Sequence, residues 1–435
     1  MIAPPISTLD REFVWHPYTQ HATEGEALPV RAAAGAWLEL EDGRKILDAI
    51  SSWWVNLHGH GHPEKAAAIG AQAHALEQVI FAGFTHAPAA RLAATLVEAA
   101  RARSLPLDKV FYSDNGSTAV EVALKMAFQA HHNRGSTGRT RFIALGGAYH
   151  GDTLGAMAVG EPAGYHAFFR PLLPPVDFVP SDDLAALEQL LAERKGQHAA
   201  FIFEPLLQGA GGMRIYSAEF LRAAADLCRA AGIFLIADEV FTGFHRTGPW
   251  LASELAGIQP DLVCLSKGLT GGFLPLGVTM TTKNIYEAFL DNDKARAFLH
   301  GHSFTGSPLA CAVALKSWEI LQRPETQARI KAITARTEDH LTSLAKHPAV
   351  AATRQLGTVG VMELKLPAGE KPGYFSTLAP RLRAGALARG VLLRPLGQVL
   401  YAVPPYCVND EELATIYRVM AELADETLRG AGKSV

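Results

Sequence analysis

Asp261-Leu-Val-Cys-Leu-Ser-Lys267-Gly-Leu-Thr-Gly-Gly272 is the stretch that decides the fold of this chain. Its apolar run, Leu262 to Leu265, predicts a strand buried on both faces. The strand ends at a lysine and a glycine-rich turn. Lys267 is therefore expected at the carboxyl edge of a sheet, where open α/β folds place their ligands. The alternative is a plain surface lysine, since a buried one must be neutral or paired.

A second strand end carries a carboxylate. Gly232-Ile-Phe-Leu-Ile-Ala237 is again fully apolar and is followed at once by Asp238. An amine that can form a Schiff base and a carboxylate that can pair with a pyridinium nitrogen are the two protein groups that a pyridoxal phosphate enzyme requires. The two strand ends together therefore indicate this cofactor.

A third motif predicts a phosphate site. The short strand Lys109 to Tyr112 is followed by Ser113-Asp-Asn-Gly116-Ser117-Thr118, which opens a predicted helix through about His131. Backbone N–H groups at a helix start favour a bound phosphate. Gly116 and Ser117 could equally form an ordinary helix cap, so this motif depends on the other two.

Length and composition limit the class of protein. A chain of 435 residues is long for one core, so two domains are expected. The hydrophobic fraction is 49%, and 40 basic against 43 acidic residues give a net charge of −3. No charged tail is present, so neither nucleic acid nor an anionic membrane is predicted as a partner.

The cysteines and the first residues bear on location. The four cysteines are scattered in apolar contexts, which favours neither a disulfide framework nor a zinc site; they are Cys228, Cys264, Cys311 and Cys407. Met1 to Tyr18 has prolines and mixed charges, and no apolar run approaches the ~18 residues of a membrane helix. We expect a cytoplasmic protein.

Three parts follow one another along the chain. Residues 1–63 read as an arm with a hairpin, whose Asp42-Gly43 is a type I′ turn signal. Residues 64–308 alternate strands and helices, which predicts an α/β domain with a mostly parallel seven-stranded sheet. Residues 309–435 begin with a long helix and continue as a small α+β domain, which the arm is expected to join. The seven predicted strands are Lys109–Ser113, Thr140–Leu145, Val176–Val179, Ala199–Phe203, Ile233–Ala237, Leu262–Leu265 and Leu276–Met280.

His58, His60 and His62 alternate and would share one face of a strand, as metal ligands do. Glycine and proline between them argue against a strand. We therefore expect no metal site.

Longer motifs resemble the class III aminotransferases, which have the aspartate aminotransferase fold, fold type I of the pyridoxal phosphate enzymes. Four of them mark the superfamily: Asp238-Glu-Val240, Gly243-Phe-His-Arg-Thr-Gly248, Leu265-Ser-Lys-Gly-Leu-Thr-Gly-Gly272 and His300-Gly-His-Ser-Phe-Thr-Gly-Ser-Pro308. Six more are similar to the branch of the family that serves biotin synthesis: Trp15–Thr19, Ser52-Trp-Trp54, Ser113–Ala127, Ala148-Tyr-His-Gly-Asp152, Glu204–Arg214 and Arg394-Pro395.

This resemblance implies a role for each cofactor residue. Lys267 would hold pyridoxal 5′-phosphate as a Schiff base and later move the substrate proton, and Asp238 would keep the pyridine nitrogen protonated. Gly116 and Ser117 would bind the phosphate. Tyr149 would stack on the ring, while its neighbour His150 is expected to be structural.

A substrate pocket and a shared site are implied as well. The implied substrate-binding residues are Tyr18, Trp53, Trp54, Tyr149, Lys267, Gly301, Arg394 and Tyr401, with Tyr18 also catalytic. Ser303 stands where the family has a threonine that binds the partner's phosphate in a homodimer. His302, where the family has proline, and His245, where it has glycine, depart from the pattern.

The implied reaction transfers the amino group of S-adenosylmethionine to 7-keto-8-aminopelargonate and yields 7,8-diaminopelargonate. Three alternatives stay open: another class III ω-aminotransferase with a diamine or an ω-amino acid as donor, including a 7,8-diaminopelargonate synthase that uses lysine; a 1,2-aminomutase; and a non-catalytic protein on the same fold. The aromatic residues Trp53, Trp54 and Tyr18 argue against the first, and the intact Lys267 and Asp238 argue against the last.

Overall fold

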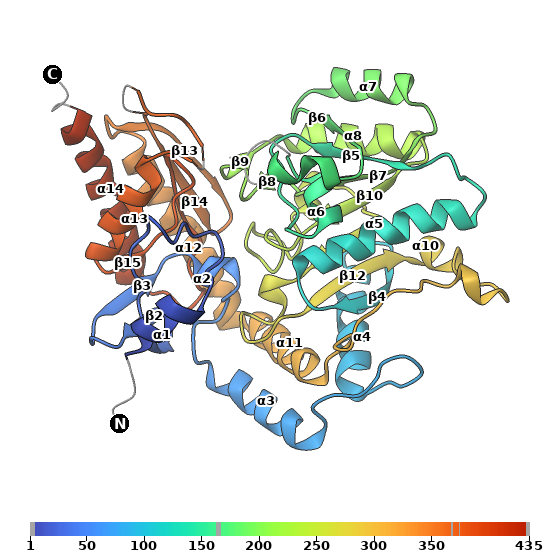
Figure 1. Cartoon of the computed structure of the whole chain (residues 1–435), viewed down its shortest axis with the longest axis horizontal. Helices are drawn as coiled ribbons and strands as arrows, with labels where there is room; N and C mark the ends of the chain where they lie inside the picture. The colour runs from blue at the N-terminus through green and yellow to red at the C-terminus, as the bar shows by residue number, and fades with distance from the viewer. Residues whose placement is uncertain (1–4, 162–166, 367–368, 374, 432–435) are drawn as a thin grey trace.

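A seven-stranded sheet forms the centre of the larger part of the molecule in the computed structural model, which describes residues 5–161, 167–366, 369–373 and 375–431 (Figure 1). The strand order is β4-β12-β11-β10-β7-β5-β6, and only β12 runs antiparallel to its neighbours. The strands are β4 (Leu107–Ser113), β5 (Arg141–Leu145), β6 (Val176–Val179), β7 (His198–Phe203), β10 (Phe234–Asp238), β11 (Leu262–Leu265) and β12 (Gly277–Thr282). All seven predicted strands are confirmed within two residues at each end.

Helices cover both faces of this sheet. Every residue of β7, β10 and β11 is buried, as a sheet covered on two sides requires. Apolar residues of α5 (Gly116–Asn133) pack with Ile202 and Ile236 on one face. Those of α8 (Ala218–Ala230) pack with Phe203 and Leu235 on the other.

The predicted caps of these helices are present. Ser217 caps α8 by accepting the Phe220 N–H, and the helix gives way to Gly232 at φ 68°. Asn115 caps α5 in a reciprocal box with Thr118, which fixes the helix start at the carboxyl end of β4.

Strands from the N-terminal and C-terminal parts of the chain lie side by side in the other part of the molecule (Figure 1). One sheet, ordered β1-β2-β3-β15, joins β1 (Val30–Ala34), β2 (Trp37–Leu40) and β3 (Lys45–Asp48) to β15 (Val391–Leu392). A second sheet contains β13 (Val350–Leu356), β14 (Val359–Leu364) and β16 (Val399–Ala402) and packs against α12 (Pro324–Leu344). The helix α13 (Leu378–Ala388) lies against β15 and α14 (Asp410–Ala431). The domain boundaries at residues 63 and 308 stay a prediction.

Three local expectations need correction. The long helix after Pro308 is two helices, α11 (Pro308–Leu321) and α12 (Pro324–Leu344), because Pro324 cannot continue a helix and starts the second one. The hairpin turn is not type I′: only Gly43 has positive φ, and Leu40 N–H donates to Arg44 across a three-residue loop. The strand β13 was not predicted, since most of its side chains are only partly buried.

The remaining elements are short connections and covering helices: α1 (Ile6–Phe13), α2 (Ser51–Trp54), α3 (Pro63–Ala75), α4 (Ala87–Arg101), α6 (Leu154–Val159), η1 (Ala167–Leu172), α7 (Leu184–Glu193), β8 (Leu207–Gln208), β9 (Arg214–Ile215), α9 (Ser253–Ala256), η2 (Lys267–Leu269), α10 (Lys283–Glu287) and η3 (Lys294–Arg296). Among the described helices, none combines the length and apolarity needed to cross a membrane.

Candidate active site

A cavity of about 800 Å³ opens at the carboxyl ends of β10 and β11, facing the part of the molecule that holds the chain ends. It brings together all of the predicted site residues except Gly301 and Ser303; those brought together are Tyr18, Trp53, Trp54, Gly116, Ser117, Tyr149, Asp238, Lys267, Arg394 and Tyr401. The strand ends that the apolar runs predicted therefore do meet in one site.

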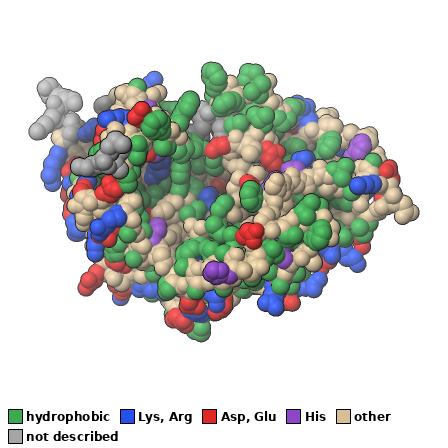
Figure 2. All heavy atoms as spheres, turned by 60° about the horizontal axis from the view of Figure 1, so that its bottom comes forward, with side chains coloured by type: hydrophobic (Ala, Val, Ile, Leu, Met, Phe, Trp, Pro, Cys, Tyr) green, Lys and Arg blue, Asp and Glu red, His purple; other side chains and the backbone are tan. Residues whose placement is uncertain are grey.

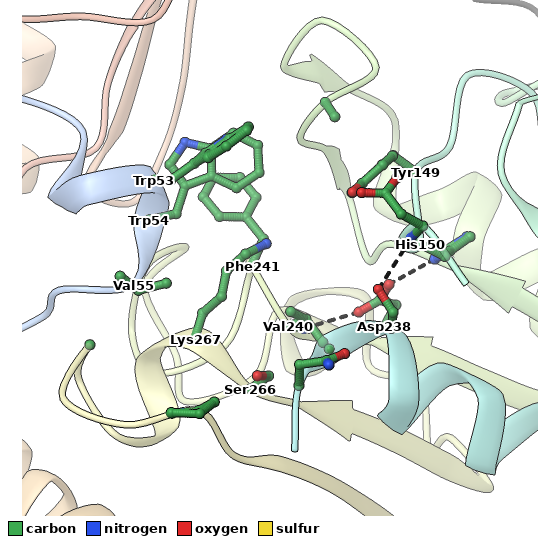
Figure 3. A pocket seen from close by; sticks show the side chains of 18 of the residues that line it. Trp53, Trp54, Val55, Tyr149, His150, Asp238, Val240, Phe241, Ser266 and Lys267 are labelled. Atoms are coloured by element: carbon green, nitrogen blue, oxygen red, sulfur yellow. Dashed lines mark hydrogen bonds and ion pairs between the residues drawn. The ribbon is translucent and has the colours of Figure 1, made fainter. Parts of the chain in front are cut away.

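Lys267 lies two residues beyond the end of β11, at φ 39°, in the left-handed region. Its side chain rises toward two aromatic rings, with Nζ 4.7 Å from the ring centre of Trp54 and 5.8 Å from that of Phe241 (Figure 3). Burial lowers the pKa of the Lys267 ammonium, and the carboxylates of Asp238 and Glu204 offset part of that effect. A larger neutral fraction makes this amine a better nucleophile and base.

Asp238 ends β10 on the opposite side of the cavity from the aromatic rings (Figure 3). Its Oδ2 is 2.7 Å from His150 Nδ1, and its Oδ1 accepts the Val240 N–H at 3.1 Å. His150, which we expected to be merely structural, thus contacts the carboxylate directly. It follows β5, so its place at the same edge of the sheet was the available signal.

Glu204 is a site residue that the sequence analysis did not single out. It follows β7 and is buried at the cavity wall, where it accepts N–H groups of Tyr149 at 3.0 Å and Gly209 at 2.9 Å. Burial raises the pKa of the Glu204 carboxyl to about 7, with His150 and the two N–H donors acting in the other direction. Like His150, it could have been found by asking which polar residue follows each parallel strand.

The start of α5 forms the polar end of the cavity. No acidic residue lies in its first turn, and Gly116 and Ser117 present the helix start to the cavity. A Cβ on Gly116 would lie 2.8 Å from Val240 Cγ1, so glycine lets the helix start approach β10 closely. Ser117 Oγ accepts the Asp152 N–H at 3.2 Å. N–H groups at a helix start whose first turn carries no acidic side chain fit a phosphate group.

Tyr18 and Tyr149 meet across the cavity. The Tyr18 hydroxyl donates to Asp152 Oδ2 at 2.6 Å and lies 3.3 Å from the Tyr149 hydroxyl. Burial, followed by the contact with Tyr18, raises the pKa of the Tyr149 phenol. The Tyr149 phenol is therefore neutral at physiological pH.

Trp53 and Trp54 form the aromatic wall. The guanidinium of Arg394 lies 4.4 Å from the ring centre of Trp53, and Tyr18 packs edge-on against the same ring. Trp54 lies against Phe241 and Tyr401. Its buried Nε1 has no hydrogen-bond partner among the described residues, so this donor is available to a ligand.

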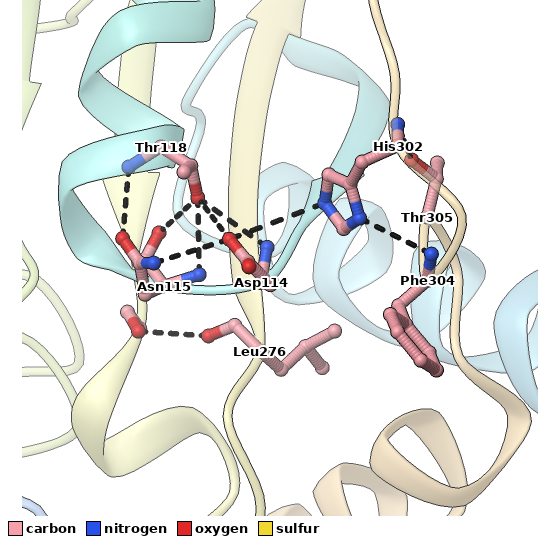
Figure 4. A network of polar contacts seen from close by, with 8 residues as sticks. Asp114, Asn115, Thr118, Leu276, His302, Phe304 and Thr305 are labelled. Atoms are coloured by element: carbon pink, nitrogen blue, oxygen red, sulfur yellow. Dashed lines mark hydrogen bonds and ion pairs between the residues drawn. The ribbon is translucent and has the colours of Figure 1, made fainter. Parts of the chain in front are cut away.

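The loop Gly301–Ser303 lies outside the cavity of its own chain. His302 Nε2 is 4.0 Å from Asp114 Oδ1, beside the cap of α5, and its Nδ1 accepts the Phe304 N–H (Figure 4). The Thr305 hydroxyl accepts the His302 N–H at 3.0 Å. Side-chain hydrogen bonds thus shape the loop where the family has a proline.

His58 and His60 hydrogen-bond to different partners, although the ring centres of His58 and His62 lie 6.2 Å apart. His60 contacts Asp48 at 2.9 Å, while His58 contacts Ser317 at 3.0 Å. His245 is buried, with Nδ1 2.9 Å from the Gly248 carbonyl oxygen. Within the described residues no group of histidine, cysteine and acidic side chains is arranged to hold a metal ion.

A buried lysine of lowered pKa, a buried carboxylate and an anion-binding helix start therefore face one cavity. This set fits pyridoxal 5′-phosphate: Lys267 would bind its aldehyde, Asp238 would pair with its ring nitrogen and the start of α5 would hold its phosphate.

Comparisons with known proteins agree with this geometry. The family model described as aminotransferase class-III matches residues 18–423. The chain is 48% identical over 430 residues to the adenosylmethionine-8-amino-7-oxononanoate aminotransferase of Synechococcus elongatus, covering 95% of this chain and 98% of the relative. It is 38% identical to the enzyme of the same name from Corynebacterium glutamicum, covering 95% and 97%.

Solved structures show the same fold. A crystal structure described as adenosylmethionine-8-amino-7-oxononanoate aminotransferase from Methanocaldococcus jannaschii superposes with a TM-score of 0.91 at 34% identity, over 97% of this chain and 98% of the other. The ω-transaminase from Pseudomonas jessenii, in complex with PMP, superposes with a TM-score of 0.92 at 27% identity, over 99% and 100%. With its fold, its cavity and a family match over most of its length, the chain belongs to the class III aminotransferases, enzymes that work with pyridoxal 5′-phosphate.

Proposed function

We propose that this aminotransferase moves the amino group of S-adenosylmethionine to 7-keto-8-aminopelargonate (8-amino-7-oxononanoate) and so makes 7,8-diaminopelargonate for biotin synthesis. The observation that carries the proposal is the wall formed by Trp53, Tyr18 and Arg394, which offers an apolar surface next to one guanidinium. An aliphatic keto acid has the matching shape, an apolar chain with a carboxylate. The names of the relatives at 48% and 38% identity support the same reaction.

Lys267 and Asp238 carry the chemistry in this proposal. When bound, pyridoxal 5′-phosphate supplies an aldehyde that takes up the amino group and a ring that accepts electrons from the substrate. Lys267, uncharged in part because of its burial, removes the proton at the substrate Cα. Asp238 keeps the ring nitrogen protonated, and His150 holds the Asp238 carboxylate in place.

The remaining residues bind and orient. Gly116 and Ser117 would hold the phosphate, and Tyr149 would lie against the ring. Arg394 would exchange its contact with the Trp53 ring for a bidentate pair with the substrate carboxylate. Tyr18 would donate or return a proton beside the reacting carbon, since its hydroxyl already reaches Tyr149 and Asp152.

A single-turnover donor screen tests the substrate assignment. The cofactor-loaded protein is mixed with one donor at a time, and the loss of the cofactor's visible absorption is followed. S-adenosylmethionine should remove it, while β-alanine and 4-aminobutyrate should do so poorly. Conversion by those ω-amino acids and none by S-adenosylmethionine would move the chain to the ω-aminotransferase alternative, and lysine belongs in the screen as a further donor.

Covalent trapping tests Lys267. Borohydride should fix the cofactor on Lys267, and Lys267→Ala should lack both the yellow colour and the label. Lys65 is an internal comparison, because it is also buried but lies outside the cavity lining. Label found on Lys65 or on any other lysine would show that the assignment is wrong.

We further propose a homodimer with shared sites. Gly301 and Ser303 are the two predicted site residues that their own cavity does not include, and the neighbouring Phe304 is exposed. Figure 2, which brings the lower side of Figure 1 forward, shows hydrophobic side chains on the surface of that face. A partner that received Ser303 would complete its phosphate site and cover apolar surface.

Complementation tests the shared site. A Lys267→Ala chain is allowed to exchange subunits with a Ser303→Ala chain that also carries Gly301→Phe. Sharing puts both lesions in one site and leaves the other intact, so activity should rise above that of either parent. No rise in activity, after subunit exchange has been demonstrated with labelled chains, would exclude a shared site.

The cytoplasmic location stays a prediction. The structure adds that all four cysteines are free thiols.

A further inference from the structure

The segment that carries the two pocket tryptophans has an unusual backbone. Ser51, Ser52, Trp53 and Trp54 have φ values of 51°, 45°, 73° and 74°, and none of them is glycine. Trp54 N–H donates to the Ile50 carbonyl at 2.7 Å and Val55 N–H to the Ser51 carbonyl at 3.0 Å. The segment is therefore one turn of left-handed helix, a form that L-residues avoid because Cβ approaches the carbonyl oxygen.

A buried carboxylate at the end of β3 holds this turn. Asp48 is fully buried and accepts the Ile50 N–H at Oδ1, 3.1 Å away. At its Oδ2 it accepts the Ser52 hydroxyl at 2.8 Å and lies 2.9 Å from His60 Nε2. His60 is itself fixed by paired backbone hydrogen bonds to Gly35. The carboxylate thus bonds both to the start of the turn and to a rigid neighbour.

Further contacts anchor the surroundings of the turn. The Ser51 hydroxyl donates to the Val403 carbonyl at 2.7 Å, just beyond β16. The buried guanidinium of Arg246 donates to the carbonyls of Asn56 and Pro404, and its charge is attracted by Asp48. Among the described residues, the titratable groups that face this carboxylate include His60, Arg246 and the thiol of Cys407.

The turn decides where the two indoles point. Successive residues of a helix are about 100° apart around its axis, and a left-handed turn reverses that direction of rotation. Trp53 consequently faces Tyr18 and Arg394, whereas Trp54 faces Phe241 and the Lys267 amine. A right-handed turn of the same sequence would rotate the second ring in the opposite sense about the axis.

We propose that Asp48 is a positioning residue of the substrate pocket, which sets Trp53 and Trp54 by holding Ser51–Trp54 in the left-handed form through Ser52 and His60. Asp48 and His60 do not line the cavity, so they act through the turn. The proposal rests on the proposed function in one respect, because it takes the two tryptophans to bind substrate.

The test compares four variants. Asp48→Asn keeps the size but weakens the charge-assisted bonds, and Ser52→Ala removes only the hydroxyl. Ser52→Gly also removes it but adopts the left-handed backbone without strain. Asp42→Asn is the matched control, since Asp42 is an exposed acid on the β2–β3 loop of the same sheet.

Two readouts separate positioning from plain stability. In the single-turnover reaction, Asp48→Asn and Ser52→Ala should raise the apparent Kd of the donor about ten-fold while the limiting rate stays within about two-fold, the effect of losing one charge-assisted bond. The near-ultraviolet circular dichroism of the tryptophans should change in the same two variants. Ser52→Gly and Asp42→Asn should resemble the wild type in both measurements.

Three outcomes would overturn the proposal: an unchanged dichroism spectrum in Asp48→Asn, a loss confined to the limiting rate, or equal effects of Ser52→Gly and Ser52→Ala. Failure of the proposed function has a different signature. Wild-type protein would then not react with S-adenosylmethionine, while the dichroism of the variants, which needs no substrate, would still decide the role of Asp48.

Discussion

Gly151→Ala is the change from which the structure predicts the clearest loss of cofactor affinity. Gly151 lies at φ 128°, between the pocket residues Tyr149 and Asp152. An added Cβ would be 2.0 Å from Ser117 Oγ, 2.6 Å from Ser117 Cβ and 2.9 Å from Ser117 Cα. Rotating the hydroxyl would relieve only the first contact, so the loop or the start of α5 must move.

The size of the effect follows from two costs. Overpacking at a close contact costs about 1–3 kcal/mol, and an alanine held at a glycine-type φ costs a similar amount. We take the cofactor-free protein to relieve about 2 kcal/mol of this strain by moving Ser117 away from the phosphate site. Cofactor binding must then restore that strain, so cofactor affinity should fall about 30-fold. Binding should therefore suffer more than the fold of the cofactor-free protein.

The assay is a titration of cofactor-free protein with pyridoxal 5′-phosphate, with inorganic phosphate as a second probe of the same site. Gly70→Ala is the control, because a Cβ there meets nothing within 4 Å and alanine favours the α3 helix. Gly151→Ala that binds both probes as tightly as Gly70→Ala would refute the assignment of the phosphate to Ser117 and the start of α5.

Three further predictions concern ionisable groups that are buried or partly buried. The raised pKa of Glu204 means that the folded state binds a proton more tightly than the unfolded state. The free energy of unfolding should therefore fall as the pH rises from 4.5 to about 7, and Glu204→Gln should abolish that slope in urea titrations. Burial lowers the pKa of Lys65, whose Nζ donates to the Gly271 carbonyl, from 10.5 to about 7. The free energy of unfolding should therefore increase as the pH rises from about 7 to 10.5, and Lys65→Met should remove this increase. The Arg354 guanidinium donates to the Met213 carbonyl at 2.6 Å, so Arg354→Ala should lower the unfolding free energy by roughly 1–3 kcal/mol; a midpoint in urea equal to that of the wild type would contradict this.

Local sequence patterns were enough to predict the sheet and the two strand ends that carry Asp238 and Lys267. A strand covered on both faces must be apolar throughout, so β10 and β11 could be recognised without their neighbours, and with them Asp238 and Lys267. The start of α5 could be predicted in the same way, because a helix cap is formed by residues that lie within a few positions of each other in the sequence. Glu204 and His150 carried no local signal beyond following a strand.

The sequence by itself thus determined the order of the elements, the sheet and the position of the lysine and the carboxylate at its edge, since these depend on short-range periodicity and on burial. Only the tertiary structure decided the left-handed turn at Ser51–Trp54, the bonds that Asp48 makes to it and the raised pKa of Glu204. The reason is physical: a strained backbone or a buried charge is stable only when groups distant in the chain supply its hydrogen bonds, and no local pattern records those partners.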